Sequence, residues 1–251
     1  MKQVHNLLLA HLPPPERSRL DPYLEAVELG MGDLMIEEDQ PIQYVWFAND
    51  AVTSTLQLMS DGDAVEAGLM GLEGMVGIQL WLGVKTTPSR TLVQVPGTAM
   101  RMRSQDFVRE VVNRPQSPLN GLIARYTHGF LVLTSQTAAC NRMHPIDERL
   151  CRWLRMVYNR VPERREMPLR QEFIAQMLGV RRATVSTAAS ILQKAGYIEY
   201  VRGRLKILNP DGLAEGACEC YELMESQFDR IFSDPWRPDQ EPQEAAAQMQ
   251  G

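Results

Sequence analysis

The spacing of hydrophobic positions changes several times along the chain. Residues 5–29 are predicted to be helical, because leucines recur at helical spacing on both sides of a Pro13-Pro14-Pro15 break. From about 30 to 104, short β-rich runs such as YVWFA and TLVQV alternate with turns that contain Gly, Asp or Pro. This pattern is typical of a β-sandwich or a small barrel. A short helix is predicted over 105–112.

A longer helix is predicted over residues 119–142. The positions of one face recur at steps close to three and four, and they are Leu119, Leu122, Tyr126, Leu133, Thr137 and Cys140. Phe130 fills the longer step between Tyr126 and Leu133. Such a near-heptad seam favours pairing with an identical helix in a dimer. Packing against the chain's own β domain is the alternative, and both can hold at once. Asn141 to Pro145 then resembles a hinge.

Two short helices and a hairpin are predicted after the hinge. A helix from Arg170 to Leu178 ends at Gly179, and a second helix from about Arg182 to Ala195 ends at Gly196. The segment YIEYVRGRLKIL predicts two strands around a tight turn. Helix, turn, helix and hairpin together predict a winged helix-turn-helix.

A last helix is predicted over 213–232, and the final residues, DPWRPDQEPQEAAAQMQG, are expected to be mobile. The charge is distributed unevenly between these parts. Residues 141–210 hold 14 Lys/Arg against 6 Asp/Glu, a net charge of +8, whereas the segments before and after it carry −5 and −8. A strongly basic segment between two acidic ones indicates a polyanionic partner.

The composition excludes some classes of protein. Hydrophobic residues make up 44% of the chain and charged residues 23%, which are ordinary globular values. The apolar runs are too short for a membrane span, and no signal peptide is apparent, so we expect a cytoplasmic protein with no membrane partner. The four cysteines do not resemble a disulfide framework.

The segment RQEFIAQMLGVRRATVSTAASILQKAGYIEYVRGRLKILNPDGL resembles the DNA-binding domain of the Crp/Fnr family of bacterial transcription regulators. The resemblance implies an α+β chain with an N-terminal jelly-roll, cyclic-nucleotide-binding-like sensor domain. Its implied parts are the sensor over 1–118, a dimerisation helix and hinge over 119–144, a winged helix-turn-helix over 145–212, and an acidic helix and tail over 213–251. It further implies a homodimer that binds a two-fold symmetric DNA operator and contacts RNA polymerase.

The second helix of this motif enters the DNA major groove with its N-terminal part. By resemblance, Arg170 and Gln171 fall at phosphate-contacting positions and Arg182 at the principal guanine-reading position. Basic residues of the hairpin would meet the flanking backbone. The complete set of candidate DNA-binding residues is Arg170, Gln171, Arg181, Arg182, Thr184, Ser186, Thr187, Arg202, Arg204 and Lys206.

The recognition helix departs from the family pattern at two positions. The family carries Arg-Glu-Thr-Val and shortly afterwards a second Arg, whereas here Ala183 replaces the acidic residue and Thr187 the later arginine. The loss of a carboxylate that accepts from cytosine, and of an arginine that donates to a base, should change the operator. We therefore expect weak binding to the family's TGTGA-type half-site.

The sensor departs from the pattern of members that bind cyclic nucleotides. Glu73 stands one place late in the glycine-rich turn, and Ser89 occupies the phosphate-arginine position, with Arg90 one residue later on the other face of the strand. Candidate effector-binding residues are Gly71, Glu73, Gly74, Ser89, Arg90, Thr134 and Ser135. A cyclic nucleotide is disfavoured against another small effector or no ligand, and no cofactor is predicted.

Metal and enzyme chemistry are also disfavoured. An iron–sulfur cluster needs about four clustered thiolates, and Cys218 and Cys220, if both on a helix, point away from each other. A cupin-type enzyme needs histidines in the barrel, but His5, His11, His128 and His144 all lie outside the β region. The sequence therefore predicts a transcription regulator without metal and without enzymatic activity.

Overall fold

The computed structural model describes residues 5–60 and 62–233. The N-terminal part contains two antiparallel sheets with strand orders β1-β7-β3 and β2-β6-β4-β5. Their strands are β1 (Glu25–Leu29), β2 (Leu34–Ile36), β3 (Tyr44–Ala48), β4 (Val52–Leu58), β5 (Ala64–Met70), β6 (Ser89–Val95) and β7 (Gly97–Arg103). These strands confirm the predicted β domain.

Short helices precede β1, connect β5 to β6 and follow β7. They are α1 (Leu7–Ala10), α2 (Pro14–Leu20), the 3₁₀ turn η1 (Asp21–Tyr23), α3 (Ile78–Trp81), α4 (Ser104–Phe107) and the π-helical turn η2 (Val108–Val112). The helical prediction for 5–29 is wrong over its last five residues, which form β1. There the backbone pairs with β7, from Glu25 opposite Arg101 to Leu29 opposite Gly97. This long-range pairing overrides a weak local helical pattern.

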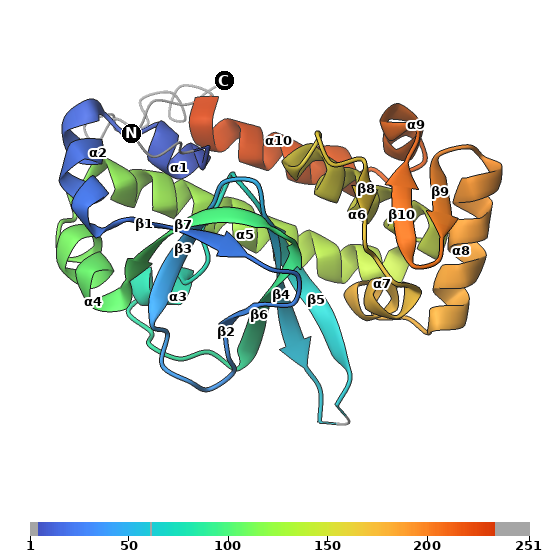
Figure 1. Ribbon diagram of the computed structural model, residues 1–251, viewed down its shortest axis with the longest axis horizontal. Helices are drawn as coiled ribbons and strands as arrows, with labels where there is room; N and C mark the ends of the chain where they lie inside the picture. Colours follow the sequence, from blue (N-terminus) through green and yellow to red (C-terminus); the bar gives the residue numbers. More distant parts are fainter. Residues whose placement is uncertain (1–4, 61, 234–251) are drawn as a thin grey trace, which may run out of the picture.

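The long helix α5 (Pro118–Met143) runs behind the sheets toward the C-terminal domain and ends at the hinge (Figure 1). It confirms the predicted helix over 119–142. Helix α10 (Cys220–Ser233) lies alongside it, and the two approach closely at Gly129, where a Cβ atom would come within 3.3 Å of Ile231 and 3.4 Å of Phe228.

The predicted seam of α5 is buried within the chain itself. Leu119, Tyr126 and Cys140 are each 0% exposed and Leu133 is 1% exposed. Pairing of these side chains with a second copy would require them to leave the core, so packing against the chain's own elements holds for this face. A different row of α5 residues faces solvent: Ala124, His128, Leu131, Ser135, Ala138 and Arg142.

The C-terminal part begins with α6 (Ile146–Arg160) and contains a small sheet of order β8-β10-β9. Its other elements are β8 (Glu166–Met167), α7 (Gln171–Leu178), α8 (Arg182–Lys194), β9 (Ile198–Val201), β10 (Arg204–Ile207) and α9 (Pro210–Glu215). The predicted helix over 213–232 is thus two helices, α9 and α10, separated by residues 216–219. Residues 234–251, predicted to be a mobile tail, lie outside the described residues.

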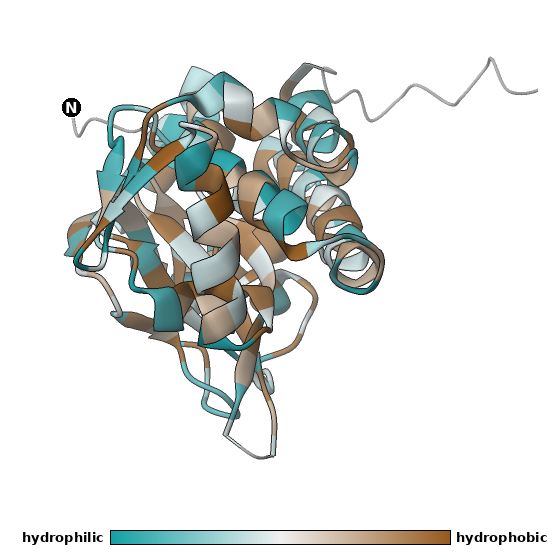
Figure 2. Cartoon of the chain, turned by 90° about the vertical axis from the view of Figure 1, so that its right-hand side faces the viewer, coloured by the Kyte–Doolittle hydropathy of each residue, from teal (hydrophilic) through white to brown (hydrophobic). Residues whose placement is uncertain are grey.

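Figure 2 views the molecule from the end that carries this small domain, where hydrophilic residues alternate with hydrophobic ones around the helices. The hydrophobic sides join one core that continues from the β domain through α5 and α6 into α7 and α8. None of the helices in the described segments has both the length and the apolar character required to span a bilayer.

Candidate nucleic-acid interface

The turn between α7 and α8 has the geometry of a helix-turn-helix. Gly179 has φ 62° and ψ 42°, and the N–H of Val180 donates to the carbonyl of Ala175 at 3.0 Å. A side chain other than glycine would be strained at this left-handed position. Buried Ile174 and Val185 hold the two helices together. The turn therefore projects the first residues of α8 away from the core.

Most of the side chains predicted to contact DNA lie on this exposed surface. Arg181, Arg182, Ser186 and Thr187 are exposed at the N-terminal half of α8, and Thr184 is half-buried. The Thr187 hydroxyl donates to the carbonyl of Ala183 at 3.2 Å, so it is engaged within its own helix.

Arg182 has a carboxylate partner in the free protein. Its Nε lies 2.9 Å from Oε1 of Glu172, and both side chains are about two-thirds exposed. An exposed pair of this kind is worth about 0–1 kcal/mol, so the guanidinium can leave Glu172 for a guanine edge at little cost.

The hairpin forms the wing. Arg202 (φ 50°) and Gly203 (φ 77°) both have positive φ, as a two-residue type I′ turn requires. Along β10, Leu205 and Ile207 are buried while Arg204 and Lys206 are exposed. This alternation directs the basic side chains to solvent.

Residues near the wing complete the basic surface. Arg204 forms an ion pair with Glu166 on β8, and this hydrogen bond holds the pKa of the Glu166 carboxyl below its ordinary value. Arg170 is exposed at the N-cap of α7, and half-buried Gln171 follows it. A Cβ atom on Gly203 would lie 3.4 Å from the Arg170 Cγ, so Arg170 borders the wing turn.

The β4–β5 hairpin of the sensor lies beside this interface. A groove of about 870 Å³ is lined by Met59 and Val65 on the sensor side and by Arg170, Arg181 and Arg182 on the other. A Cβ atom on Gly179 would lie 2.9 Å from the Val65 side chain. The sensor therefore directly contacts the turn that positions α8.

Polar contacts join the sensor to α6 and the loop after it. The indole N–H of Trp153 donates to Glu66 at 3.2 Å. Arg160 forms an ion pair with Glu73 at 2.8 Å, and Arg164 forms one with Asp50 at 3.0 Å. These contacts hold the first helix of the C-terminal domain against the β domain.

The predicted ribose-binding turn is occupied by the protein's own side chains. Glu73 is 7% exposed and its carboxylate accepts from Arg160. A Cβ atom on Gly71 would come within 2.7 Å of the Arg160 side chain, and one on Gly74 within 2.3 Å of the Tyr126 ring. Arg160 and Tyr126 thus fill the space in front of these glycines.

The remaining effector candidates face in different directions. Ser89 is buried and shares a 2.8 Å hydrogen bond with Thr87, whereas the half-buried Arg90 forms two hydrogen bonds, at 2.6 and 2.8 Å, to Glu38. Ser89 and Arg90 therefore lie on opposite faces of β6. On α5, Thr134 is half-buried and Ser135 is exposed. Three of the seven candidate effector residues, Glu73, Ser89 and Arg90, thus form hydrogen bonds to other side chains of the protein.

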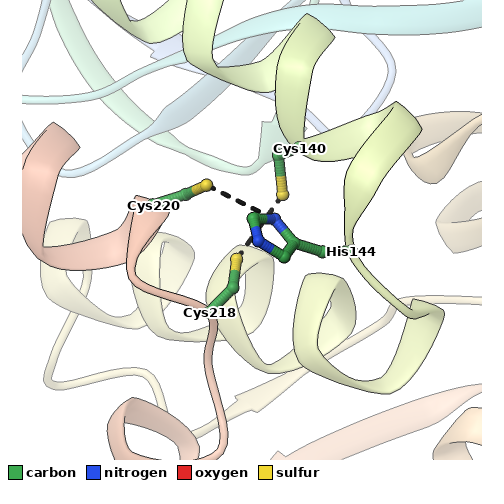
Figure 3. A group of neighbouring side chains, drawn as sticks. All are labelled: Cys140, His144, Cys218 and Cys220. Carbon is green, nitrogen blue, oxygen red and sulfur yellow. Dashed lines mark hydrogen bonds between the residues drawn. The ribbon is translucent and has the colours of Figure 1, made fainter.

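The prediction that Cys218 and Cys220 diverge on a helix is wrong. The chain leaves the helical conformation at Gly216, so Cys218 lies in the loop before α10 and Cys220 is its first residue. Both side chains converge with Cys140 and His144 (Figure 3). This cluster was not predicted from the sequence.

Comparisons with known proteins agree with this architecture. FixK2 from Bradyrhizobium japonicum is 16% identical, with a TM-score of 0.64 over 78% of this chain and 98% of that one. CLP from Xanthomonas campestris is 13% identical, with a TM-score of 0.61 over 78% and 99%. A CooA mutant from Carboxydothermus hydrogenoformans is 17% identical, with a TM-score of 0.56 over 86% and 96%. No curated protein matches the sequence.

The chain has the fold of these Crp/Fnr regulators, in which an N-terminal β domain, a long helix and a C-terminal helix-turn-helix domain follow one another. Within it, residues 148–215 match the model of the Crp-like helix-turn-helix domain. The resemblance stated from the sequence is therefore confirmed, and the C-terminal domain is a DNA-binding helix-turn-helix domain of the Crp type.

Proposed function

We propose that this protein is a sequence-specific transcription regulator, not an enzyme, that binds a two-fold symmetric DNA operator as a homodimer. The observation that supports this proposal is the exposed row of Arg181, Arg182, Ser186 and Thr187 at the start of α8, next to the basic wing. The N-terminal residues of such a helix read base edges in the major groove. Its DNA partner would place the protein in the cytoplasm, and RNA polymerase is the second partner that we propose.

The exposed face of α5 supports a dimer. The solvent-facing residues 124, 128, 131, 135, 138 and 142 follow one another at alternating steps of four and three, which is the spacing of a coiled-coil seam. Leu131, at the middle of the row, is 59% exposed, and its neighbours along the row include two alanines and a serine. Small residues let two copies of α5 approach closely around Leu131. We therefore move the proposed dimer seam from the buried face to this one.

The two-fold symmetry of such a dimer sets the form of the operator. Dimers of helix-turn-helix proteins read half-sites about one helical turn of DNA apart. Selection of bound duplexes from a random pool, followed by immunoprecipitation of the tagged protein from cells, should recover one inverted-repeat motif. A motif without two-fold symmetry, or no duplex that resists heparin competition, would contradict the proposal.

Two substitutions in α8 determine the expected half-site. Ala183 cannot accept a hydrogen bond from cytosine through its side chain, and Thr187 cannot replace an arginine donor. We expect the selected motif to differ from TGTGA, and nanomolar specific binding to a TGTGA half-site at physiological salt would contradict this.

We further propose that the β domain does not hold a cyclic mononucleotide by ribose and phosphate contacts at its glycine-rich turn. Glu73 is paired with Arg160 and Arg90 with Glu38, so the two side chains that would hold such a ligand have protein partners. Calorimetry with cyclic AMP and cyclic GMP should show no submicromolar binding. Cyclic di-GMP belongs in the same test, because CLP is described as a c-di-GMP responsive regulator.

A further inference from the structure

Four side chains from three segments meet at the junction between the long helix and the C-terminal domain. Cys140 lies in the last turn of α5 and His144 is the C-cap residue of that helix. Cys218 comes from the loop before α10 and Cys220 from the first turn of α10. Their ligand atoms all lie within 4.8 Å of one another (Figure 3).

The distances between these atoms fit a tetrahedral site for one metal ion. The sulfurs of Cys140 and Cys218 are 3.5 Å apart, and the sulfur of Cys220 is 3.5 Å from Nδ1 of His144. With Zn–S bonds of about 2.3 Å and Zn–N bonds of about 2.0–2.1 Å, a tetrahedron has edges of roughly 3.5–3.8 Å. The three cysteines and the histidine therefore stand near the corners that zinc requires.

An iron–sulfur cluster fits this spacing poorly. Such a cluster places several iron and sulfide atoms between its cysteine ligands. Ligand atoms within 4.8 Å of one another leave space for a single ion. Three thiolates and one imidazole in a closed tetrahedral set are typical of structural zinc.

The surrounding groups are those that orient metal ligands. Nε2 of His144 lies 3.1 Å from Oε1 of Glu219, so its N–H can donate to the carboxylate while Nδ1 faces the sulfurs. Metal-binding histidines are oriented by such a carboxylate on the other ring nitrogen. The side-chain amide of Gln136 donates to the Cys220 sulfur at 3.0 Å, a contact that favours the thiolate.

Two buried arginines supply an independent indication of negative charge at this place. Arg149 and Arg152 on α6 are 6% and 3% exposed, and the Nε atom of each has no hydrogen-bond partner. Within the described residues neither forms an ion pair with a carboxylate within 4.0 Å. Arg149 donates to Asn141 Oδ1 at 2.8 Å and Arg152 Nη1 lies 3.5 Å from Thr137 Oγ1, so both guanidinium groups lie beside the end of α5 that carries Cys140.

These partners of the two guanidinium groups are neutral, as is the Met224 sulfur, to which Arg152 donates at 3.2 Å. A buried charge that has such partners but no counter-charge is still costly. Three thiolates, one neutral imidazole and a divalent cation carry a net charge of −1, which offsets part of the charge of the two guanidinium groups. The charge balance of α6 therefore favours an occupied metal site over four protonated side chains.

We propose that Cys140, His144, Cys218 and Cys220 bind one structural Zn²⁺ ion. The ion would join the end of α5, the hinge at His144 and the beginning of α10. Because His144 is the last residue before Pro145 and α6, its coordination would fix the angle at which the C-terminal domain leaves the long helix. This proposal concerns metal binding alone and holds whether or not the chain binds DNA.

Metal analysis of the full-length protein, purified without chelators, tests the site. We expect about one zinc ion per chain by mass spectrometry of the metal content. Cys218→Ser and Cys220→Ser should each lower the zinc content at least several-fold. The matched control is Cys151→Ser, because Cys151 is also buried, lies on the adjacent α6, and is outside the ligand set, so this variant should retain the zinc.

If the serine variants fail to fold, the site can still be tested by removing the metal from the wild-type protein and replacing it. Zinc release by a chelator should make three of the four cysteines reactive to a thiol reagent, and reloading with Co²⁺ should produce the visible absorption of a tetrahedral thiolate complex. Iron with acid-labile sulfide, a Cys140–Cys218 disulfide, or a metal-free protein that does not take up Co²⁺ would each overturn the proposal. DNA binding is measured separately, so failure of one proposal leaves the other intact.

Discussion

The buried ion pair between Glu73 and Arg160 should stabilise the protein, and Glu73→Gln tests this. The two nitrogens Nε and Nη2 of Arg160 each lie 2.8 Å from Oε1 of Glu73, and the side chains are 5% and 9% exposed. Burial acts to lower the pKa of Arg160, yet that pKa lies above its ordinary value because Glu73 and Glu225 stabilise the charge. The pair joins the turn after β5 to the end of α6.

The size of the destabilisation depends on which other contacts Arg160 keeps after the substitution. Breaking a buried ion pair costs about 3–5 kcal/mol, because one charge is left without compensation. In Glu73→Gln, Arg160 keeps Glu225 at 3.5 Å and the carbonyl of Met156 at 2.8 Å, which places the cost near the lower end, about 3 kcal/mol. For a chain of this size that corresponds to a decrease in Tm of roughly 6–12 °C.

Arg160→Met should cost more than Glu73→Gln. It leaves the Glu73 carboxylate with the Gly71 N–H, at 3.2 Å, as its remaining hydrogen-bond donor. The double variant Glu73→Gln/Arg160→Met should then be less destabilised than the sum of the two single variants, by about 2 kcal/mol.

Urea and thermal unfolding of the wild-type protein, the two single variants and the double variant give the coupling free energy between Glu73 and Arg160. Glu38→Gln is the control, since its partner Arg90 is about a third exposed and the change should cost less than about 1 kcal/mol. The reasoning is refuted if Glu73→Gln unfolds like the control. It is also refuted if a cyclic mononucleotide raises the Tm of the wild-type protein and Glu73→Gln abolishes the effect, because Glu73 would then be a ligand contact.

Three further predictions concern the interface, the dimer and the pH dependence. Arg182→Ala should lose about 1–3 kcal/mol of operator-binding free energy and relax the base preference at one position of each half-site. Arg204→Ala should instead weaken binding to all duplexes evenly and reduce the slope of log affinity against log salt concentration by about one. If the two variants behave alike in gel shifts at several salt concentrations, the separation of base contacts from backbone contacts is contradicted. Leu131→Glu should give a monomer by light scattering, because it places like charges opposite each other in the proposed seam, and a retained dimer would exclude this face. Burial raises the pKa of Glu66 to about 7, although Ser54 and Trp153 donate to it. The folded protein therefore binds the extra proton between the unfolded pKa and about 7, so the unfolding free energy should fall by about 3 kcal/mol as the pH rises through that window. Urea unfolding at about pH 5 and about pH 8 measures this change, and Glu66→Gln should reduce the difference in unfolding free energy between the two pH values. An unchanged difference in the variant would contradict the role of Glu66.

The helix-turn-helix could be predicted from the sequence because its signals are local. Gly179 is required by a left-handed C-cap and Gly203 by a type I′ turn, and both lie within a few residues of the elements that they delimit. The predicted helix boundaries, 170–178 and 182–195, differ from those of α7 and α8 by one residue at most.

The face of α5 that we propose for dimerisation could not be identified from local sequence signals. Two rows of this helix have near-heptad spacing, one through Tyr126 and Leu133 and the other through His128 and Leu131. Periodicity tells which residues share a face but does not tell what covers that face. The row through Tyr126 and Leu133 is buried within the chain, and the row through His128 and Leu131 is exposed.

The candidate zinc ligands were not predicted because Cys218 and Cys220 were assumed to lie on one continuous helix. Cys140 and His144 are four residues apart, so they share a face of α5, and this spacing was readable in the sequence. Cys218 and Cys220 diverge only if the helix is continuous, and it is broken at Gly216, where a Cβ atom would lie 3.1 Å from both the Cys151 sulfur and the Tyr197 ring. Gly216, the C-cap residue of α9, is therefore packed tightly against Cys151 of α6, and the two thiols that follow it lie toward the hinge. A bulkier residue at position 216 should disturb the zinc site without altering any ligand, which makes the geometry of this loop, and not the count of cysteines, the condition for metal binding.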